Sequence, residues 1–230
     1  ASRIRLGIDD PEHYAAWRLG EMLKERKVKV KGAIAARHRF AGQPLPFISA
    51  EPLATLTPEP LAEDIRTINK VSQNLHSELM LRRVGMARGE ATVENGVKGI
   101  EAMLAEAGVS RTSYDFSDGS GMSTYNRVSP RAGTQLLRWA AKQSWGTAWR
   151  DSLPIAGVDG TLARRFKGTR LEGKLFAKTG TVNQVTGLSG YFITARGQTL
   201  IFSSFVNDIP GDVSVSGIID KALLLIAAEN

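Results

Sequence analysis

The sequence predicts an α+β fold in which an antiparallel sheet is flanked by helices. Most of the elements expected in the first 140 residues are helices, and three strand-like runs then follow one another between residues 173 and 206. A last helical pattern ends the chain. Consecutive strands with short connections pair antiparallel, so helices followed by such a run indicate an α+β layer architecture.

The helices are predicted from their first and last residues and from apolar residues that recur every three or four positions. Pro in the first helical turn marks two starts, after Asp10 and after Ser129, and Ser129 is also a favourable N-cap. Gly108 is a typical helix end. The expected helices are 10–26, 60–83 with a break near Val71, 92–108, a segment that begins at Ser129, and about 213–228.

The strands are predicted from alternating or continuous apolar runs. The three runs of the sheet are 173–178, 187–194 and 199–206, and residues 195–198 ("ARGQ") are short enough for a tight hairpin. Residues 28–38 ("VKVKGAIAARH") alternate in the same way, which predicts a further strand. Residues 113–126 are rich in turn formers, so no regular element is expected there.

We expect one domain over residues 1–230, interrupted by a proline-rich loop at about 42–60. Five of the nine prolines lie between Pro44 and Pro60. The hydrophobic content of 42% and the charged content of 23% are those of an ordinary globular protein. No apolar stretch approaches the roughly 18 residues that a membrane span needs.

Charge and composition exclude several kinds of site. The net charge of +7 (30 basic against 23 acidic residues) favours anionic partners such as nucleic acid, acidic lipid or anionic wall polymers. The basic residues are scattered, and the nearest to a basic run, at 24–31, has no aromatic ladder, which argues against nucleic acid. The chain has no cysteine and three widely separated histidines, so we expect no disulfide, no metal site and no cofactor.

Three short motifs suggest chemistry: Ser72-Gln73-Asn74, Lys178-Thr179-Gly180 and the glycine-rich "DFSDGSGMS" (115–123). Each has a plain structural alternative. Ser72 precedes a predicted helix, where serine is a good N-cap, and a lysine before glycine can simply end a strand in a turn. Ser-x-Asn and Lys-Thr-Gly occur together in serine β-lactamases and penicillin-binding proteins, which makes the functional reading of this pair specific.

The surrounding residues extend this resemblance. The segments "PLAEDIRTINKVSQNLHSELMLRRVG", "DGSGMSTYNRVSP", "LPIAGVDGTLARRF" and "AKTGTVNQVTGLSGYF" follow one another over most of residues 58–206. Together they resemble the D-alanyl-D-alanine carboxypeptidase/endopeptidase family, the class C low-molecular-mass penicillin-binding proteins. The resemblance implies a penicillin-binding protein/serine β-lactamase-like domain, of which this chain resembles the C-terminal half.

The resemblance also implies roles for individual residues. Ser72 is expected to relay a proton to the leaving D-alanine, with Asn74 holding the substrate amide and the lysine. Lys178 and Thr179 are expected to hold the terminal carboxylate of the substrate. Gly180 leaves room for a peptide added along the strand, and the N–H group of Thr181 is one arm of the oxyanion hole.

Two further positions are expected to contact the diamino acid of the substrate: Arg165 and Asn183. For Arg165, a surface charge is an equally good interpretation. The glycine-rich motif is expected to be structural, with turns that brace the cleft. The partners implied are peptidoglycan stem peptides and β-lactam antibiotics, and the implied location is periplasmic or otherwise extracytoplasmic.

The nucleophile of the family is not found in these residues. The family uses the serine of Ser-x-x-Lys, and none of the seventeen serines has a lysine three positions later. The nearest mimic is Thr67-Ile68-Asn69-Lys70, which lies inside the block that leads to Ser72. In the family the nucleophile segment comes earlier in the full chain. That segment is therefore a further expected partner, including the case in which it is a separate polypeptide.

Two functions are therefore compatible with the sequence. One is a serine D,D-peptidase whose nucleophile lies outside these residues, and the other is a non-catalytic module that binds peptidoglycan peptides. An unrelated α+β domain with chance motifs is the third interpretation. Because the main sheet of the family takes strands from both ends of the full chain, these residues alone are expected to leave an open sheet edge or an exposed apolar face.

Overall fold

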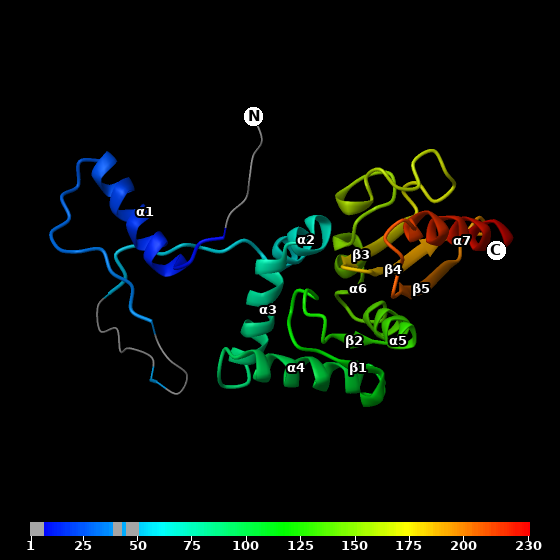
Figure 1. Ribbon diagram of the computed structural model, residues 1–230, viewed down its shortest axis with the longest axis horizontal. Coiled ribbons are helices and arrows are strands. Elements are labelled where there is room, and N and C mark those ends of the chain that lie inside the picture. Colours follow the sequence, from blue (N-terminus) through cyan, green and yellow to red (C-terminus); the bar gives the residue numbers. More distant parts are fainter. Residues whose placement is uncertain (1–6, 39–42, 45–50) are drawn as a thin grey trace. The chain divides into compact units, whose positions relative to one another are not determined.

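The computed structural model describes residues 7–38, 43–44 and 51–230. The contacts divide the chain into two compact units, Ala1–Leu56 and Thr57–Asn230 (Figure 1). The boundary lies within the proline-rich loop predicted at 42–60, whose described residues form no helix or strand, as expected. The single domain over 1–230 stays a prediction, and each unit is described by itself.

The first unit contains helix α1, Pro11–Glu25, which confirms the helix predicted at 10–26. The carboxylate of Asp10 caps it by accepting a hydrogen bond from the His13 N–H at 2.8 Å. The strand predicted at 28–38 is wrong, because no residue of this range is in a strand. The described part of the unit contains no other strand to pair with it, and unpaired extended backbone is not held in a sheet.

The second unit contains the remaining helices. Helix α5 begins as predicted, with the Ser129 side chain accepting from the Ala132 N–H at 3.1 Å. The break near Val71 and the end at Gly108, which has a φ of +74°, are also confirmed. The helices are α2 (Leu61–Val71), α3 (Asn74–Met86), α4 (Val93–Glu106), α5 (Pro130–Ala140), α6 (Gly146–Ser152) and α7 (Val215–Glu229), with 3₁₀ turns η1 (Arg111–Ser113) and η2 (Gly160–Leu162).

The main sheet has the order β3-β4-β5 and is antiparallel, which confirms the predicted fold class. Its strands are β3 (Leu175–Val182), β4 (Val185–Ile193) and β5 (Thr199–Val206). The prediction that the first strand ends at Lys178 is wrong. Lys178, Thr179 and Gly180 stay paired with β4, and a two-residue turn at Asn183 and Gln184 closes the hairpin later.

A small second sheet joins the ends of the turn-rich segment. Strand β1 (Tyr114–Asp115) pairs antiparallel with β2 (Arg127–Val128). The prediction of no regular element over 113–126 is therefore wrong for three residues at its start: Ser113, which ends η1, and the two residues of β1. Tyr114 is buried against α4 and α5, and this packing fixes the first strand of the pair.

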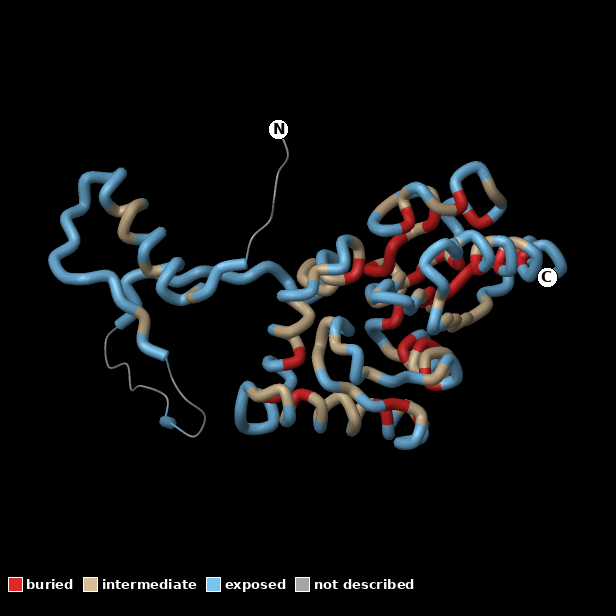
Figure 2. The backbone as a smooth tube through the Cα atoms, in the orientation of Figure 1, coloured by how far each residue is buried: buried red, intermediate tan, exposed pale blue. Residues whose placement is uncertain are grey.

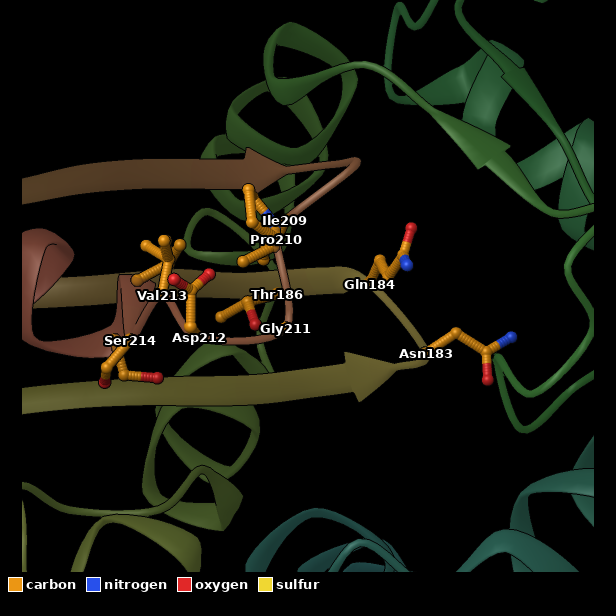
Figure 3. Close-up of a pocket in the computed structure, with 11 residues that line it drawn as sticks. Asn183, Gln184, Thr186, Ile209, Pro210, Gly211, Asp212, Val213 and Ser214 are labelled. Atoms are coloured by element: carbon orange, nitrogen blue, oxygen red, sulfur yellow. The ribbon is translucent and has the colours of Figure 1, made fainter.

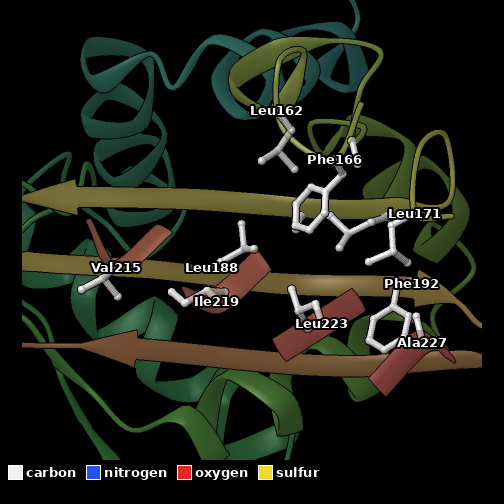
Figure 4. Close-up of a cluster of buried hydrophobic side chains, with 12 residues drawn as sticks. Leu162, Phe166, Leu171, Leu188, Phe192, Val215, Ile219, Leu223 and Ala227 are labelled. Carbon is white, nitrogen blue, oxygen red and sulfur yellow. The ribbon is translucent and has the colours of Figure 1, made fainter. Parts of the chain in front are cut away.

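The largest core lies between one face of the main sheet and α7. Alternate residues of the strands point toward the helix, and the helix presents every fourth residue to them (Figure 4). Leu175, Ala177, Leu188 and Phe192 from the sheet meet Val215, Ile219, Leu223 and Ala227 from α7. Buried positions of the described chain gather in the second unit (Figure 2).

In the described part of the second unit, the outer edge of β5 and an apolar face of α7 are uncovered. Strand β5 pairs with β4 alone, and α7 exposes Ile218, Leu225 and Ile226. None of the described helices has the length and the apolar character that a membrane span requires.

We expect residues 1–230, prepared alone, to self-associate through this strand edge and helix face, because open edges and apolar patches attract other copies. Sedimentation velocity over a range of protein concentrations measures this. A stable monomer that unfolds cooperatively at every concentration contradicts the prediction.

Candidate active site

Two of the predicted catalytic residues meet. The Lys178 ammonium donates a hydrogen bond to the Ser72 hydroxyl at 2.9 Å, although the two residues are 106 positions apart. Ser72 comes from the turn between α2 and α3, and Lys178 comes from the middle of β3. The fold thus brings the Ser-x-Asn and Lys-Thr-Gly motifs together.

The turn that carries Ser72 has an unusual backbone. Ser72 has a φ of +57°, in the left-handed region, and ends α2 as its C-cap. A residue other than glycine costs about 1–2 kcal/mol in this conformation. The N-cap of α3 is Gln73, whose side chain accepts from the Leu75 N–H at 3.1 Å. The interpretation of Ser72 as an N-cap is therefore wrong, and its hydroxyl is directed to Lys178 instead.

Strand β3 is an edge strand, and a nearby segment covers only part of its outer edge. The Ala156 N–H donates to the Leu175 carbonyl at 2.9 Å, and the Ala177 N–H donates to the Pro154 carbonyl at 3.0 Å. Because backbone groups alternate along an antiparallel strand, the next outward-facing residues are Thr179 and Thr181. Among the described residues, none forms a β-bridge with this edge beyond Ala177.

The residues beside Lys178 leave this part of the edge open to a ligand. A side chain at Gly180 would meet no atom within 4 Å. The Thr179 hydroxyl lies 2.7 Å from that of Thr161 in η2, and the Thr179 carbonyl accepts from the Lys178 ammonium at 2.9 Å. Thr181 is exposed. The open edge therefore offers hydroxyls, an ammonium and N–H groups over the four successive residues from Lys178 to Thr181.

The environment of Lys178 favours loss of its proton. Burial lowers the pKa of the Lys178 ammonium below its usual value of 10.5, because the charged form loses solvation. Its two hydrogen-bond partners, a hydroxyl and a carbonyl, are uncharged. A lysine with a depressed pKa next to a serine hydroxyl can move a proton through that hydroxyl.

Two further predicted residues, Asn74 and Arg165, are not part of the contact between Ser72 and Lys178. Asn74 is the exposed first residue of α3, and within the described structure no hydrogen bond joins its side chain to Lys178. Arg165 forms an ion pair with Asp220 of α7, with its Nε 3.2 Å from the carboxylate, and both side chains are 21% exposed. The roles of Asn74 and Arg165 toward a substrate stay predictions.

Asn183 lies in the β3–β4 turn, with a φ of +49°. A cavity of about 430 Å³ borders this turn and is lined by residues 183–184, 186 and 209–216. Figure 3 shows Asn183 and Gln184 at the turn and Asp212–Ser214 on the far side of the cavity. Neither Ser72 nor Lys178 lines it, so the cavity is separate from the contact between the two motifs.

The glycine-rich motif packs against the helix that follows Ser72. The Glu78 carboxylate accepts from the N–H groups of Gly119 and Ser120, at 3.2 and 2.9 Å. A side chain on Gly119 would come within 2.7 Å of the Ser77 carbonyl. The motif thus braces α3. Its glycines predicted turns that brace the cleft, but nothing local in the sequence pointed to Glu78 as the partner.

Lys70 and Asp159 form an ion pair beside Ser72, and no pattern in the sequence pairs them. The Lys70 ammonium donates to both carboxylate oxygens of Asp159, at 2.9 and 2.7 Å. In the sequence, Lys70 is notable only as the lysine of Thr67-Ile68-Asn69-Lys70, which mimics Ser-x-x-Lys. Residues 89 positions apart carry no local pattern that could have shown this contact.

The fold and the two motifs define a domain of the penicillin-binding protein and serine β-lactamase class. Penicillin-binding protein 4 from Haemophilus influenzae, solved with a β-lactam, has a similar fold (TM-score 0.82, 24% identity, 95% of this chain and 51% of that chain). An extended-spectrum β-lactamase is similar at a TM-score of 0.54 and 18% identity, over 73% of this chain and 61% of that one.

Within this class, the chain belongs to the D-Ala-D-Ala carboxypeptidase 3 (S13) family, whose model matches residues 1–229. A D-alanyl-D-alanine carboxypeptidase from an Actinomadura species is 36% identical over 210 residues, which cover 89% of this chain and 38% of that protein. The carboxypeptidase DacB of Haemophilus influenzae is 26% identical over 208 residues, covering 89% and 42%. The chain thus spans about two fifths of the length of these relatives.

Proposed function

We propose that this chain supplies the proton relay and the substrate-binding strand of a serine D,D-carboxypeptidase/endopeptidase that acts on peptidoglycan stem peptides outside the cytoplasm and is inhibited by penicillins. One observation carries the proposal: Ser72 and Lys178 are hydrogen-bonded next to the open end of an edge strand. The nucleophilic serine of Ser-x-x-Lys belongs, in this proposal, to the remainder of the full-length protein.

The substrate peptide lies along β3 as an added strand. The N–H group of Thr181 stabilises the oxyanion that forms when the nucleophile attacks the carbonyl of the penultimate D-alanine. Thr179 and Lys178 hold the terminal carboxylate. The substrate chain has to end near Lys178, because Pro154 and Ile155 already pair with the edge of β3 at Ala177 and the residues before it.

The lysine of Ser-x-x-Lys takes the proton of the nucleophilic serine during the attack. Collapse of the tetrahedral intermediate then breaks the C–N bond and leaves an acyl-enzyme. The leaving amine needs one proton, and Ser72 gives it from its hydroxyl while Lys178 replenishes that hydroxyl. Water then hydrolyses the ester and releases the shortened peptide. With penicillin the same attack opens the β-lactam amide, and the ring nitrogen takes the proton.

Intact-mass spectrometry of the full-length protein before and after benzylpenicillin tests the proposal. We expect a penicilloyl adduct, located by peptide mapping on a serine outside residues 1–230. An adduct on a serine of this chain overturns the assignment of the nucleophile. Absence of any adduct, together with retained binding of stem peptides, supports the non-catalytic binding module instead.

Gly180→Ala is expected to impair acylation while leaving the stability of the fold nearly unchanged. The new methyl group meets no protein atom within 4 Å, so we expect the free energy of unfolding to change by no more than about 0.5–1 kcal/mol. It projects from the same face of β3 as Lys178, next to the open edge along which the substrate lies, so acylation by benzylpenicillin should fall on the order of tenfold.

Gly173→Ala is the matched control for this change. Gly173 also has open space around it, but it lies just before the strand and has a φ of +69°. We expect Gly173→Ala to lower stability and leave acylation unchanged. Equal acylation by Gly180→Ala and the unaltered protein contradicts the placement of the substrate.

A further inference from the structure

We propose that the ion pair between Lys70 and Asp159 sets the position of Ser72 relative to Lys178, which makes both Lys70 and Asp159 positioning residues of the active site. This inference rests on the proposed function for its catalytic consequence. Its structural content, that the pair holds the two motifs together, stands on the contacts alone.

Both residues of the ion pair also form hydrogen bonds with the backbone of the 153–159 segment. The Lys70 ammonium donates to the Leu153 carbonyl at 2.6 Å in addition to its two bonds with the Asp159 carboxylate. The Lys70 side chain is only 14% exposed. Asp159 also accepts from the Ile155 N–H at 2.8 Å, so the carboxylate joins the lysine to the backbone of the 153–159 segment. Charge-assisted bonds of this kind are stronger than neutral ones.

The 153–159 segment is fixed directly to the strand that carries Lys178. Its Pro154 and Ala156 exchange backbone hydrogen bonds with Ala177 and Leu175 at 3.0 and 2.9 Å. Ala177 immediately precedes Lys178. A displacement of this segment therefore reaches Lys178 through one peptide unit.

The other end of the ion pair is equally close to Ser72. Lys70 is the penultimate residue of α2, and Ser72 follows after Val71. Asn69, the residue before Lys70, donates to the buried Ser152 hydroxyl at 2.7 Å. Two successive residues near the end of α2 are thus attached to neighbouring sites: Asn69 to the last residue of α6, and Lys70 to the 153–159 segment that follows it.

The two backbones are also in direct contact at this point. Gly160 has a φ of +57°, and a side chain there would come within 2.6 Å of the Lys70 carbonyl. The end of α2 consequently has no room to move toward the segment, and the ion pair prevents movement away from it.

These contacts connect Ser72 and Lys178 by two routes. One is their direct hydrogen bond, and the other runs from Lys70 through Asp159 and the 153–159 segment to the strand that carries Lys178. Loss of the ion pair removes the second route, so the Ser72 turn is free to move away from Lys178. The left-handed backbone of Ser72 is itself unfavourable, which favours this movement. Misplacement of a catalytic group by about 1 Å can cost a hundredfold in rate. Within this second route, the ion pair is the contact that a side-chain substitution can remove without changing a catalytic motif, because the other contacts are backbone hydrogen bonds.

The test uses Lys70→Met, Asp159→Asn and the double variant in the full-length protein. Asp159→Asn removes the charge but keeps an acceptor for the Ile155 N–H, which protects the fold. We expect each single variant to lower the rate of acylation by benzylpenicillin on the order of tenfold. The double variant should be no slower than the slower single variant, because both changes remove one interaction.

A second readout does not depend on catalysis. The pKa of Lys178, followed by NMR of ¹³C-labelled lysine and assigned with Lys178→Arg, is expected to lie below 10.5 in the unaltered protein and to rise toward 10.5 in both single variants, as Lys178 gains solvent. Ser129→Ala, which removes the cap of α5, is the control for general loss of stability and should change neither quantity.

An unchanged pKa of Lys178 in both single variants overturns the inference, and so do rate losses that add in the double variant. If the unaltered protein is not acylated at all, the proposed function fails, and the pKa of Lys178 still decides whether the ion pair holds the site together.

Discussion

Lys178→Ala is expected to reduce acylation of the full-length protein by benzylpenicillin, and turnover of a D-Ala-D-Ala peptide, by about a hundredfold or more. Loss of one preorganised group that stabilises charge in the transition state has this magnitude. The change removes the donor to the Ser72 hydroxyl and the positive charge beside the open edge of β3. Stopped-flow or quench measurement of the second-order acylation rate provides the number.

The stability of the Lys178→Ala variant should not fall with the rate. Burial disfavours the charged ammonium, so the folded protein binds its proton less tightly than the unfolded chain. Below its lowered folded-state pKa, Lys178 therefore destabilises the fold, and this effect disappears as the pH rises toward 10.5.

Lys174→Ala is the matched control, because Lys174 is exposed and lies just before the same strand. It should leave the acylation rate unchanged. An acylation rate of Lys178→Ala within twofold of the unaltered protein would remove Lys178 from the active site.

Substitution of Ser72 is expected to lower the acylation rate, and one substitution, Ser72→Gly, is expected to raise the stability of the fold at the same time. Ser72→Ala removes the hydroxyl that Lys178 holds, so acylation should fall by roughly the 10²–10⁴-fold that a positioned proton donor contributes. Ser72→Gly should lose the same activity but unfold at a higher temperature, because glycine adopts a φ of +57° without the cost that serine bears.

The comparison of these two variants tests the relay directly. If Ser72 were present only to shape the turn, Ser72→Gly would keep its acylation rate. Ser110→Ala, at an exposed serine of the same unit, is the control and should change neither rate nor stability. A crystal structure of Ser72→Ala with an unmoved Lys178 would show that the cleft geometry is kept.

Local signals determined most of the elements of this protein. Asp10-Pro11 and Ser129-Pro130 fix two helix starts because capping oxygens and the preset φ of proline act within one turn. The hairpin at 195–198 is equally local. The strand predicted at 28–38 failed for the opposite reason, since a strand exists only where a partner accepts and donates its hydrogen bonds.

The motifs were recognisable in the sequence, but their arrangement was decided by tertiary structure. The sequence by itself determined that Ser72-Gln73-Asn74 and Lys178-Thr179-Gly180 are present, and their order along the chain supported the family. Only folding decided that Ser72 adopts a left-handed backbone, that β3 continues through Lys178, and that the two side chains lie 2.9 Å apart. The pairing of Lys70 with Asp159 was invisible for the same physical reason: contacts between distant residues depend on how whole elements pack, and no short stretch of sequence records that packing.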